Sequence, residues 1–239
     1  MPFHNRLGAL CWTLAAPLFL IANVVVGLRW TDPAFSWATN NVSDLGNVSC
    51  GVWDTTRPRY VCSPWHDAMN VAFVLTGILL VAGFALTWRH TAGGKAGSWG
   101  KALMLLGGAG LGLAGAFPAD VDENLHLLAA LLVIVFGNIG LLVAGFARTG
   151  TPLARLRWVT LGLGVLGTAG SVLFFAQQGV GIGVGGMERV AVFPLSVWAC
   201  YAGLHLLAGV YRSRGSRKSL RLDDGMGGAA AAPSESGRR

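Results

Sequence analysis

Six long apolar runs, separated by short polar segments, dominate the hydropathy pattern of the chain. A helix that crosses a hydrocarbon core of about 30 Å needs about 20 residues, and each run is close to that length. The predicted spans are residues 7–28, 66–88, 99–117, 125–146, 157–177 and 190–211. Because a backbone inside lipid must satisfy its own hydrogen bonds, the pattern predicts an all-α polytopic membrane protein. Residues 1–211 then form a bundle of six transmembrane helices.

The composition fits this class. Apolar residues make up 53% of the chain and charged residues only 12%, whereas a soluble domain carries about 25% charged residues. The 35 glycines follow no Gly-X-Y repeat and are typical of closely packed membrane helices. The first run is longer than the apolar core of a signal peptide. We therefore interpret it as an uncleaved membrane anchor.

The basic residues predict the orientation. With the N-terminus in the cytoplasm, 14 of the 18 Lys and Arg residues fall in cytoplasmic segments and 8 of the 11 acids fall outside. The positive-inside rule therefore places both termini in the cytoplasm and leaves one long outer loop, residues 30–65. Arg outnumbers Lys 15 to 3, as in GC-rich genomes, which favours a bacterial plasma membrane. The net charge of +7 thus reflects topology, and no nucleic-acid partner is expected.

Residues 212–239 differ in composition from the spans. The segment begins with several Arg and Lys residues that are suited to lie on anionic lipid. From Asp223 on it is rich in Gly, Ala and Ser, which predicts disorder. We expect a cytoplasmic tail that is first basic and then disordered, and no second domain.

The four cysteines fall into two classes. Cys11 and Cys200 lie inside predicted spans, where a thiol packs as a small apolar group. Cys50 and Cys62 lie in the outer loop, in the oxidising compartment, where a disulfide is expected and two free thiols are the alternative. The loop is also rich in aromatic residues, which indicates either an interfacial belt or a lid over the helix ends.

Compact polar motifs occur in each predicted outer segment. They are Asn41-Val42-Ser43-Asp44-Leu45-Gly46 in the long loop, His66-Asp67 at the second span, Phe117-Pro118-Ala119-Asp120 with His126 around the third connection, and Glu188-Arg189 before the sixth span. A six-helix bundle brings these motifs together on one face. Structural roles are also open: Asp120 with Glu123 as a helix cap, or an ion pair of Asp44 with Arg189.

Three kinds of chemistry are candidates for this cluster. His126 with Asp120 and Asp44 is a candidate acid–base set, and Asn41, Ser43, Glu188 and Arg189 are candidate substrate-binding residues. His66, His126 and Asp120 are candidate ligands for zinc, although their spacing matches no standard signature and no cofactor is firmly implied. The alternative is a polar lock that only holds the loops down.

Two further features have a structural interpretation. Gly162-x-Gly164-x-x-Gly167 formally fits a dinucleotide fingerprint, but it lies inside an apolar run without a preceding strand, so helix packing is the better interpretation. His205 is the one ionisable residue well inside a predicted span, and we interpret it as a packing histidine. Because no acid or base lies in mid-span, proton-coupled transport is disfavoured.

Three of the motifs, in order, resemble a known family. Asn41-x-Ser43-Asp44-Leu45-Gly46, then Gly115-x-Phe117-Pro118-x-Asp120 with His126, then Gly186-x-Glu188-Arg189 resemble the domain of unknown function 998 family over residues 8–211. The resemblance implies a six-helix integral membrane protein of bacterial or archaeal type, and it implies no activity. The chain lacks the paired His-x-x-x-His of transmembrane metal hydrolases.

The expected function is that of a non-catalytic bundle that binds a lipid or a partner in a polar vestibule at the outer face. One alternative is an intramembrane hydrolase or transferase acting on a lipid or lipid-linked substrate at the outer leaflet. The second alternative is a transporter or channel component. The expected partners are the lipid bilayer and either a lipid ligand or another membrane protein.

Overall fold

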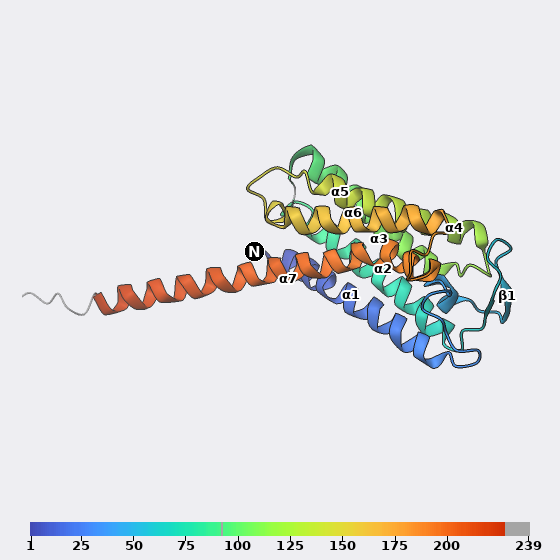
Figure 1. The fold of residues 1–239 in the computed structure, drawn as a ribbon. Helices are drawn as coiled ribbons and strands as arrows, with labels where there is room; N and C mark the ends of the chain where they lie inside the picture. The colour runs from blue at the N-terminus through green and yellow to red at the C-terminus, as the bar shows by residue number, and fades with distance from the viewer. Residues whose placement is uncertain (92, 228–239) are drawn as a thin grey trace, which may run out of the picture.

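The structure is a computed structural model that describes residues 1–91 and 93–227. Every predicted apolar run forms a helix (Figure 1). Five helices are unbroken: α1 (Phe3–Arg29), α2 (His66–Thr87), α3 (Gly94–Ala116), α6 (Arg157–Phe175) and α7 (Val184–Gly227). The fourth run is continuous but changes type, from α4 (Glu123–Leu131) through the π-helical turn η2 (Leu132–Gly137) to α5 (Asn138–Ala144).

Among the residues that the structure describes, five segments are long and apolar enough to cross a membrane. They are Phe3–Arg29, His66–Thr87, Glu123–Ala144, Ala154–Phe175 and Val184–Gly209. The predicted span 99–117 forms α3, which has 23 residues but is not among the five. Eight of those 23 residues are glycine, which lowers the mean hydropathy of the helix without shortening it.

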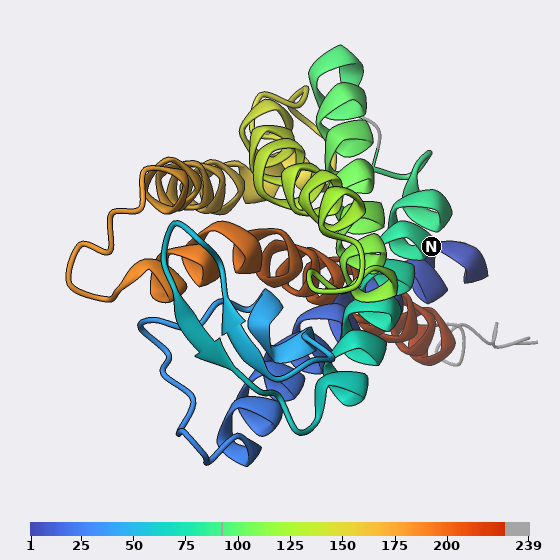
Figure 2. The ribbon, with the colours of Figure 1, turned by 90° about the vertical axis from the view of Figure 1, so that its right-hand side faces the viewer.

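The helices run between two ends of the bundle that differ in character (Figure 1). The loop face is the end that carries residues 30–65 and the connections 117–122 and 176–183. The tail face is the opposite end, which carries the N-terminus, the connections 88–93 and 145–156, and the continuation of α7 beyond the bundle. Figure 2 looks onto the loop face and shows residues 30–65 lying in front of α1 and α7.

Large aromatic side chains fill the centre of one half of the bundle. α1 packs against α2 and α7, and at their junction Trp12, Phe84 and Trp198 are fully buried. The Trp12 ring meets Phe84 at 5.0 Å and Trp198 at 5.5 Å between centroids, in edge-on geometry. The Trp198 indole N–H donates to Thr160 Oγ1 at 2.9 Å. This contact ties α7 to α6.

Glycine permits a close helix contact between α2 and α3. A Cβ on Gly77 would lie 2.4 Å from the backbone nitrogen of Gly112, so no larger residue fits without moving one helix. Small residues allow membrane helices to approach in this way. α3 packs in turn against η2 and α5, so the third helix lies between α2 and the fourth helical run.

Next to the π-helical turn, buried hydrogen bonds of Asn138 connect α5 to α6 and α7. Asn138 Nδ2 donates to the carbonyl oxygens of Ile134 and Ala191, each at 2.8 Å, and to Ser171 Oγ at 3.1 Å. A Cβ on Gly167 would lie 2.0 Å from Asn138 Oδ1. Gly167 therefore serves helix packing, as the sequence interpretation of the glycine motif predicted.

The last helix is longer than predicted at both ends. α7 begins at Val184 rather than at residue 190 and continues to Gly227. The first part of the predicted tail, residues 212–227, is thus helical, since Arg, Lys and Leu are good helix formers. Residues 228–239 of the predicted tail lie outside the described residues.

Candidate functional site at the loop face

A disulfide-closed hairpin organises the long loop. β1 (Gly51–Trp53) pairs antiparallel with β2 (Arg59–Val61), and the predicted disulfide between Cys50 and Cys62 closes its base with a Cα–Cα distance of 4.2 Å. The hairpin itself was not predicted. Its signal in the sequence is weak, because only the turn formers Asp54 and Pro58 mark it between two three-residue strands.

The turn of the hairpin is fixed by one carboxylate. Asp54 Oδ1 accepts from the backbone N–H of Thr56 at 2.8 Å and of Arg57 at 3.2 Å, and Oδ2 pairs with Arg59 at 3.0 Å. Burial alone would raise the pKa of Asp54, but these hydrogen bonds and the charge of Arg59 hold the pKa below its ordinary value. The turn directs Arg57 and Arg59 back towards the loop.

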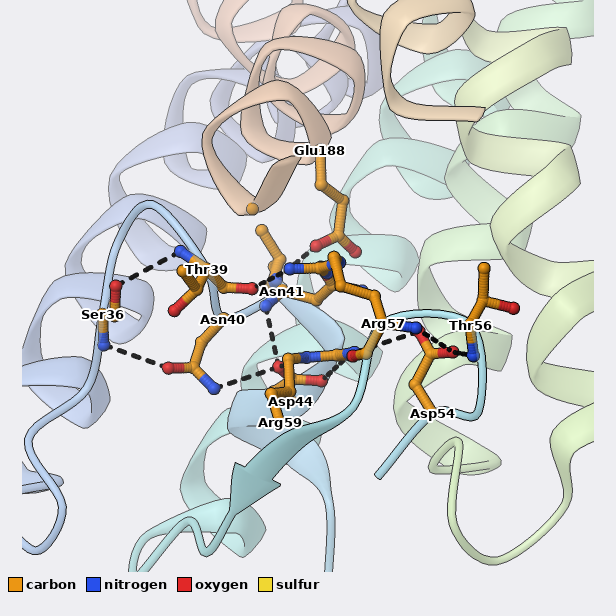
Figure 3. A network of polar contacts seen from close by, with 12 residues as sticks. Ser36, Thr39, Asn40, Asn41, Asp44, Asp54, Thr56, Arg57, Arg59 and Glu188 are labelled. Carbon is orange, nitrogen blue, oxygen red and sulfur yellow. Dashed lines mark hydrogen bonds and ion pairs between the residues drawn. The ribbon is translucent and has the colours of Figure 1, made fainter. Parts of the chain in front are cut away.

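Asp44 lies at the centre of the polar network (Figure 3). Its side chain is 1% exposed and accepts two hydrogen bonds from Arg59, from Nε and from Nη2, both at 2.6 Å. The backbone N–H of Asn41 donates at 2.8 Å and Asn40 Nδ2 at 3.2 Å. The alternative of an ion pair with Arg189 is therefore wrong, because the hairpin delivers Arg59 to this carboxylate. Burial would lower the pKa of Arg59, but Asp44 raises the pKa above its ordinary value.

Two of the predicted substrate-binding residues hold the loop in place. Arg189 Nη1 donates to the carbonyl oxygens of Asn40 at 3.0 Å and Gly185 at 2.7 Å, and its guanidinium lies 5.2 Å from the centre of the Trp37 ring. Asn41 Oδ1 accepts from Arg57 Nη2 at 2.6 Å. Both side chains thus bind the protein's own loop.

Asp120 ties the third connection to the same loop. Its two carboxylate oxygens accept from the backbone N–H groups of Val48 at 3.1 Å and Ser49 at 2.6 Å. The N-cap of α4 is Asp122, whose side chain accepts from the N–H of Leu125 at 3.0 Å. The alternative of an Asp120–Glu123 cap is therefore wrong, since helix α4 begins two residues later than that pair requires.

Three polar side chains from three motifs meet at one small cavity. Ser43 from the loop, His126 from α4 and Glu188 from α7 line a cavity of about 30 Å³. The rest of its wall is apolar: Val42, Phe73, Leu111, Ala114, Ala130, Val133, Ile134 and Val192. Two of these residues, Val133 and Ile134, belong to the π-helical turn, and such turns are frequent at functional sites.

The hydrogen bonds of His126 and Glu188 determine which of their side-chain atoms remain available to a ligand. His126 is 8% exposed, and its Nδ1–H donates to the carbonyl oxygen of Phe117 at 2.8 Å. In a neutral ring this leaves the lone pair on Nε2. Glu188 is 6% exposed and accepts from the backbone N–H of Val42 at 2.5 Å. Figure 3 shows the Glu188 side chain pointing from its helix towards the loop.

The three predicted zinc ligands have separate partners. His66 Nδ1 is hydrogen-bonded to the carbonyl oxygen of Ser63 at 3.0 Å. His126 is hydrogen-bonded to the carbonyl oxygen of Phe117, and Asp120 accepts from the backbone of the long loop. Among the described residues, no three His, Cys, Asp or Glu side chains are grouped to hold a metal ion. Zinc binding stays a prediction of the sequence.

The family model for proteins of unknown function named DUF998 matches residues 13–205. The chain belongs to the DUF998 family. The match includes the loop-face network and the cavity residues of the DUF998 protein. No curated protein and no solved structure is significantly similar to the chain.

Proposed function

We propose that the DUF998 protein crosses a bacterial plasma membrane six times, with the loop face outside and both termini in the cytoplasm. The charge distribution supports this orientation, since 12 of the 16 basic residues that the structure describes fall on the tail-face side and 8 of the 10 acids on the loop-face side. The disulfide also favours it, because disulfides persist in oxidising compartments. α3 packs along α2 on one side and α5 on the other, as a spanning helix of the bundle does, which supports a sixth span.

The function that the geometry supports best is non-catalytic binding of a lipid at the loop face. The observation that carries it is the shared cavity of Ser43, His126 and Glu188. The Glu188 carboxylate and the His126 Nε2 atom both accept hydrogen bonds. A matching ligand therefore presents donors, as a hydroxyl or an amino group does. The cavity is close to the size of one water molecule. It therefore admits a single hydroxyl or amino group of a lipid headgroup.

The surrounding polar residues act as a lock for the loop. The predicted catalytic carboxylates Asp44 and Asp120 accept four and two hydrogen bonds, respectively, from the loop and hairpin. The network therefore serves to position the loop over the cavity.

Native mass spectrometry of the full chain in mild detergent tests the binding proposal. The wild-type protein is expected to retain a lipid with a hydroxyl or amino headgroup. Glu188→Gln is expected to retain at least about tenfold less, because a charge-assisted hydrogen bond is worth about 1.5–3 kcal/mol. Glu123→Gln is the matched control, since Glu123 is exposed at the start of α4.

Equal lipid retention in wild type and Glu188→Gln, or no retained lipid in either, contradicts the binding proposal. The melting temperature of each variant shows that the comparison is made between folded proteins.

A second candidate is an intramembrane hydrolase or transferase that acts on a lipid-linked substrate. It is favoured by one observation, that a serine hydroxyl, a histidine ring and a carboxylate line the same cavity, which are the residue types of an activated nucleophile with its base. A fluorophosphonate probe, which labels activated serines, separates the two candidates. Labelling of Ser43 that is lost in His126→Ala supports the enzyme, whereas an unlabelled wild-type protein supports binding alone.

A further inference from the structure

A second, larger pocket opens at the tail face. Its volume is about 270 Å³, and its wall comes from Met1, from the connections 88–93 and 145–156 and from α7. Its polar side chains are His90, Arg155 and His205. His205 is thus more than the packing histidine that the sequence suggested, since its half-buried side chain lines an open pocket.

The pocket is positively charged and has no acidic residue in its wall. Within the described part of the chain, the ion pairs join Arg59 to Asp44 and Asp54, and His66 to Asp67, and all lie at the loop face. Burial, more than the nearby N-terminal amine and His4, lowers the pKa of His90, which favours the neutral ring with one N–H donor. None of the three pocket side chains has an acidic partner among the described residues.

The pocket also has room for a ligand beside these groups. A Cβ added to Gly150 or Gly209, which both line the pocket, would meet no atom within 4 Å. The apolar side of the wall includes Leu206 of α7. The pocket therefore combines cationic groups with an apolar surface at one end of a membrane bundle.

We infer that this pocket binds a phosphate group, held by Arg155, His90 and His205. The planar guanidinium of arginine matches phosphate oxygens in paired hydrogen bonds, and basic pockets between membrane helices suit anionic headgroups. The phosphate comes either from an anionic phospholipid of the adjoining leaflet or from free inorganic phosphate. This inference is independent of the proposed function, because the two sites lie at opposite ends of the bundle.

Calorimetric titration of the full chain in detergent tests the inference with three probes. Dioctanoyl phosphatidylglycerol represents the lipid source, inorganic phosphate the free source, and dioctanoylglycerol an apolar control without phosphate. We expect one of the phosphate probes to bind and Arg155→Gln to raise its Kd about tenfold. Arg148→Gln, which removes an exposed positive charge from the same face outside the pocket, is expected to change the Kd less than twofold.

Arg155 is exposed, so its variant is expected to fold, and His205→Gln provides a second variant inside the pocket with the same expected loss. Tighter binding of phosphatidylglycerol identifies the lipid source, and equal or tighter binding of inorganic phosphate identifies the free source. The inference is overturned if neither phosphate probe binds, if dioctanoylglycerol binds as tightly as the phosphate probes, or if Arg155→Gln and Arg148→Gln weaken binding equally.

Discussion

At the scale of single residues, the buried ion pair between Asp44 and Arg59 holds the loop to the hairpin. Both side chains are almost fully buried, with exposures of 1% and 8%. A buried ion pair adds little net stability compared with an apolar pair, but removing one partner strands the other charge. The energetic consequence of losing Arg59 is therefore large even though the pair itself contributes little.

Arg59→Gln is expected to lower the free energy of unfolding by about 3–5 kcal/mol, because it leaves the Asp44 carboxylate buried without its bidentate partner. The measurement is unfolding by SDS titration in mixed micelles. Arg29→Gln is the control, since Arg29 is exposed and only lies over the Trp65 ring. Equal losses in the two variants would show that Asp44 does not depend on Arg59.

Asp54 gives the loop a pH dependence at the acid end. Its pKa is lowered in the folded protein, so its contribution to stability is present above the ordinary Asp pKa of about 4 and is lost as the pH falls through the lowered value. The melting temperature of the wild type is expected to fall more steeply below pH 4 than that of Asp54→Asn. Parallel curves for the two proteins would show that the turn does not hold this carboxylate.

Much of the candidate site could be predicted from residue types, but the pairing of its charges could not. Ser43, His126 and Glu188 belong to three motifs that six spans bring to one face, and the structure places all three at one cavity. The partner of Asp44 lies 15 residues along a loop that has no helical or strand period, so no spacing rule selects Arg59 over Arg189. That choice depends on the hairpin.

At the scale of elements, the β1–β2 hairpin holds the long loop in place, and the Cys50–Cys62 disulfide closes the base of this hairpin. The bond joins residues 12 apart, and closing so short a loop contributes about 3 kcal/mol in the chain-entropy model. It also keeps Arg57 and Arg59 over the loop. The stability of the loop and that of the disulfide are therefore coupled.

Replacing both Cys50 and Cys62 by Ser is expected to lower the free energy of unfolding by about 3 kcal/mol and to abolish the effect of reducing agent on the melting temperature. The control is the double change of Cys11 and Cys200 to Ser, which are free cysteines. A melting temperature of the wild type that does not respond to reducing agent contradicts this role of the disulfide.

The contact between α2 and α3 predicts different results for two glycines. Gly77→Ala forces a methyl group to 2.4 Å from the Gly112 backbone nitrogen and is expected to cost about 1–3 kcal/mol. Gly162→Ala meets no atom within 4 Å and is expected to be neutral or to stabilise α6 by up to about 1 kcal/mol. SDS titration of both variants checks the contrast, and similar values for the two would contradict the close helix packing.

The helices were predictable because hydropathy and length alone define a membrane helix, whereas the details inside them were not. Each predicted run forms a helix, yet the π-helical turn Leu132–Gly137 has no Pro or other marker in its sequence. It depends on contacts with α3 and on the Asn138 hydrogen bonds to Ile134 and Ala191. Contacts between distant segments of this kind leave no local pattern.

At the scale of the whole molecule, the two ends of the bundle carry opposite chemistry. The loop face holds the buried ion pair, the disulfide and a cavity with acceptor groups, while the tail face holds a pocket with cationic groups. The assignment of each pocket to a side of the membrane depends on one claim, that the loop face is outside.

Cysteine labelling with a membrane-impermeant maleimide measures the orientation directly. In a background with Cys11 and Cys200 changed to Ser, Val121→Cys reports on the loop face and Arg148→Cys on the tail face, since both positions are exposed. Labelling of Val121→Cys in intact cells, with Arg148→Cys labelled only after permeabilisation, is the predicted result. The reverse pattern would contradict the orientation and would assign each pocket to the other leaflet.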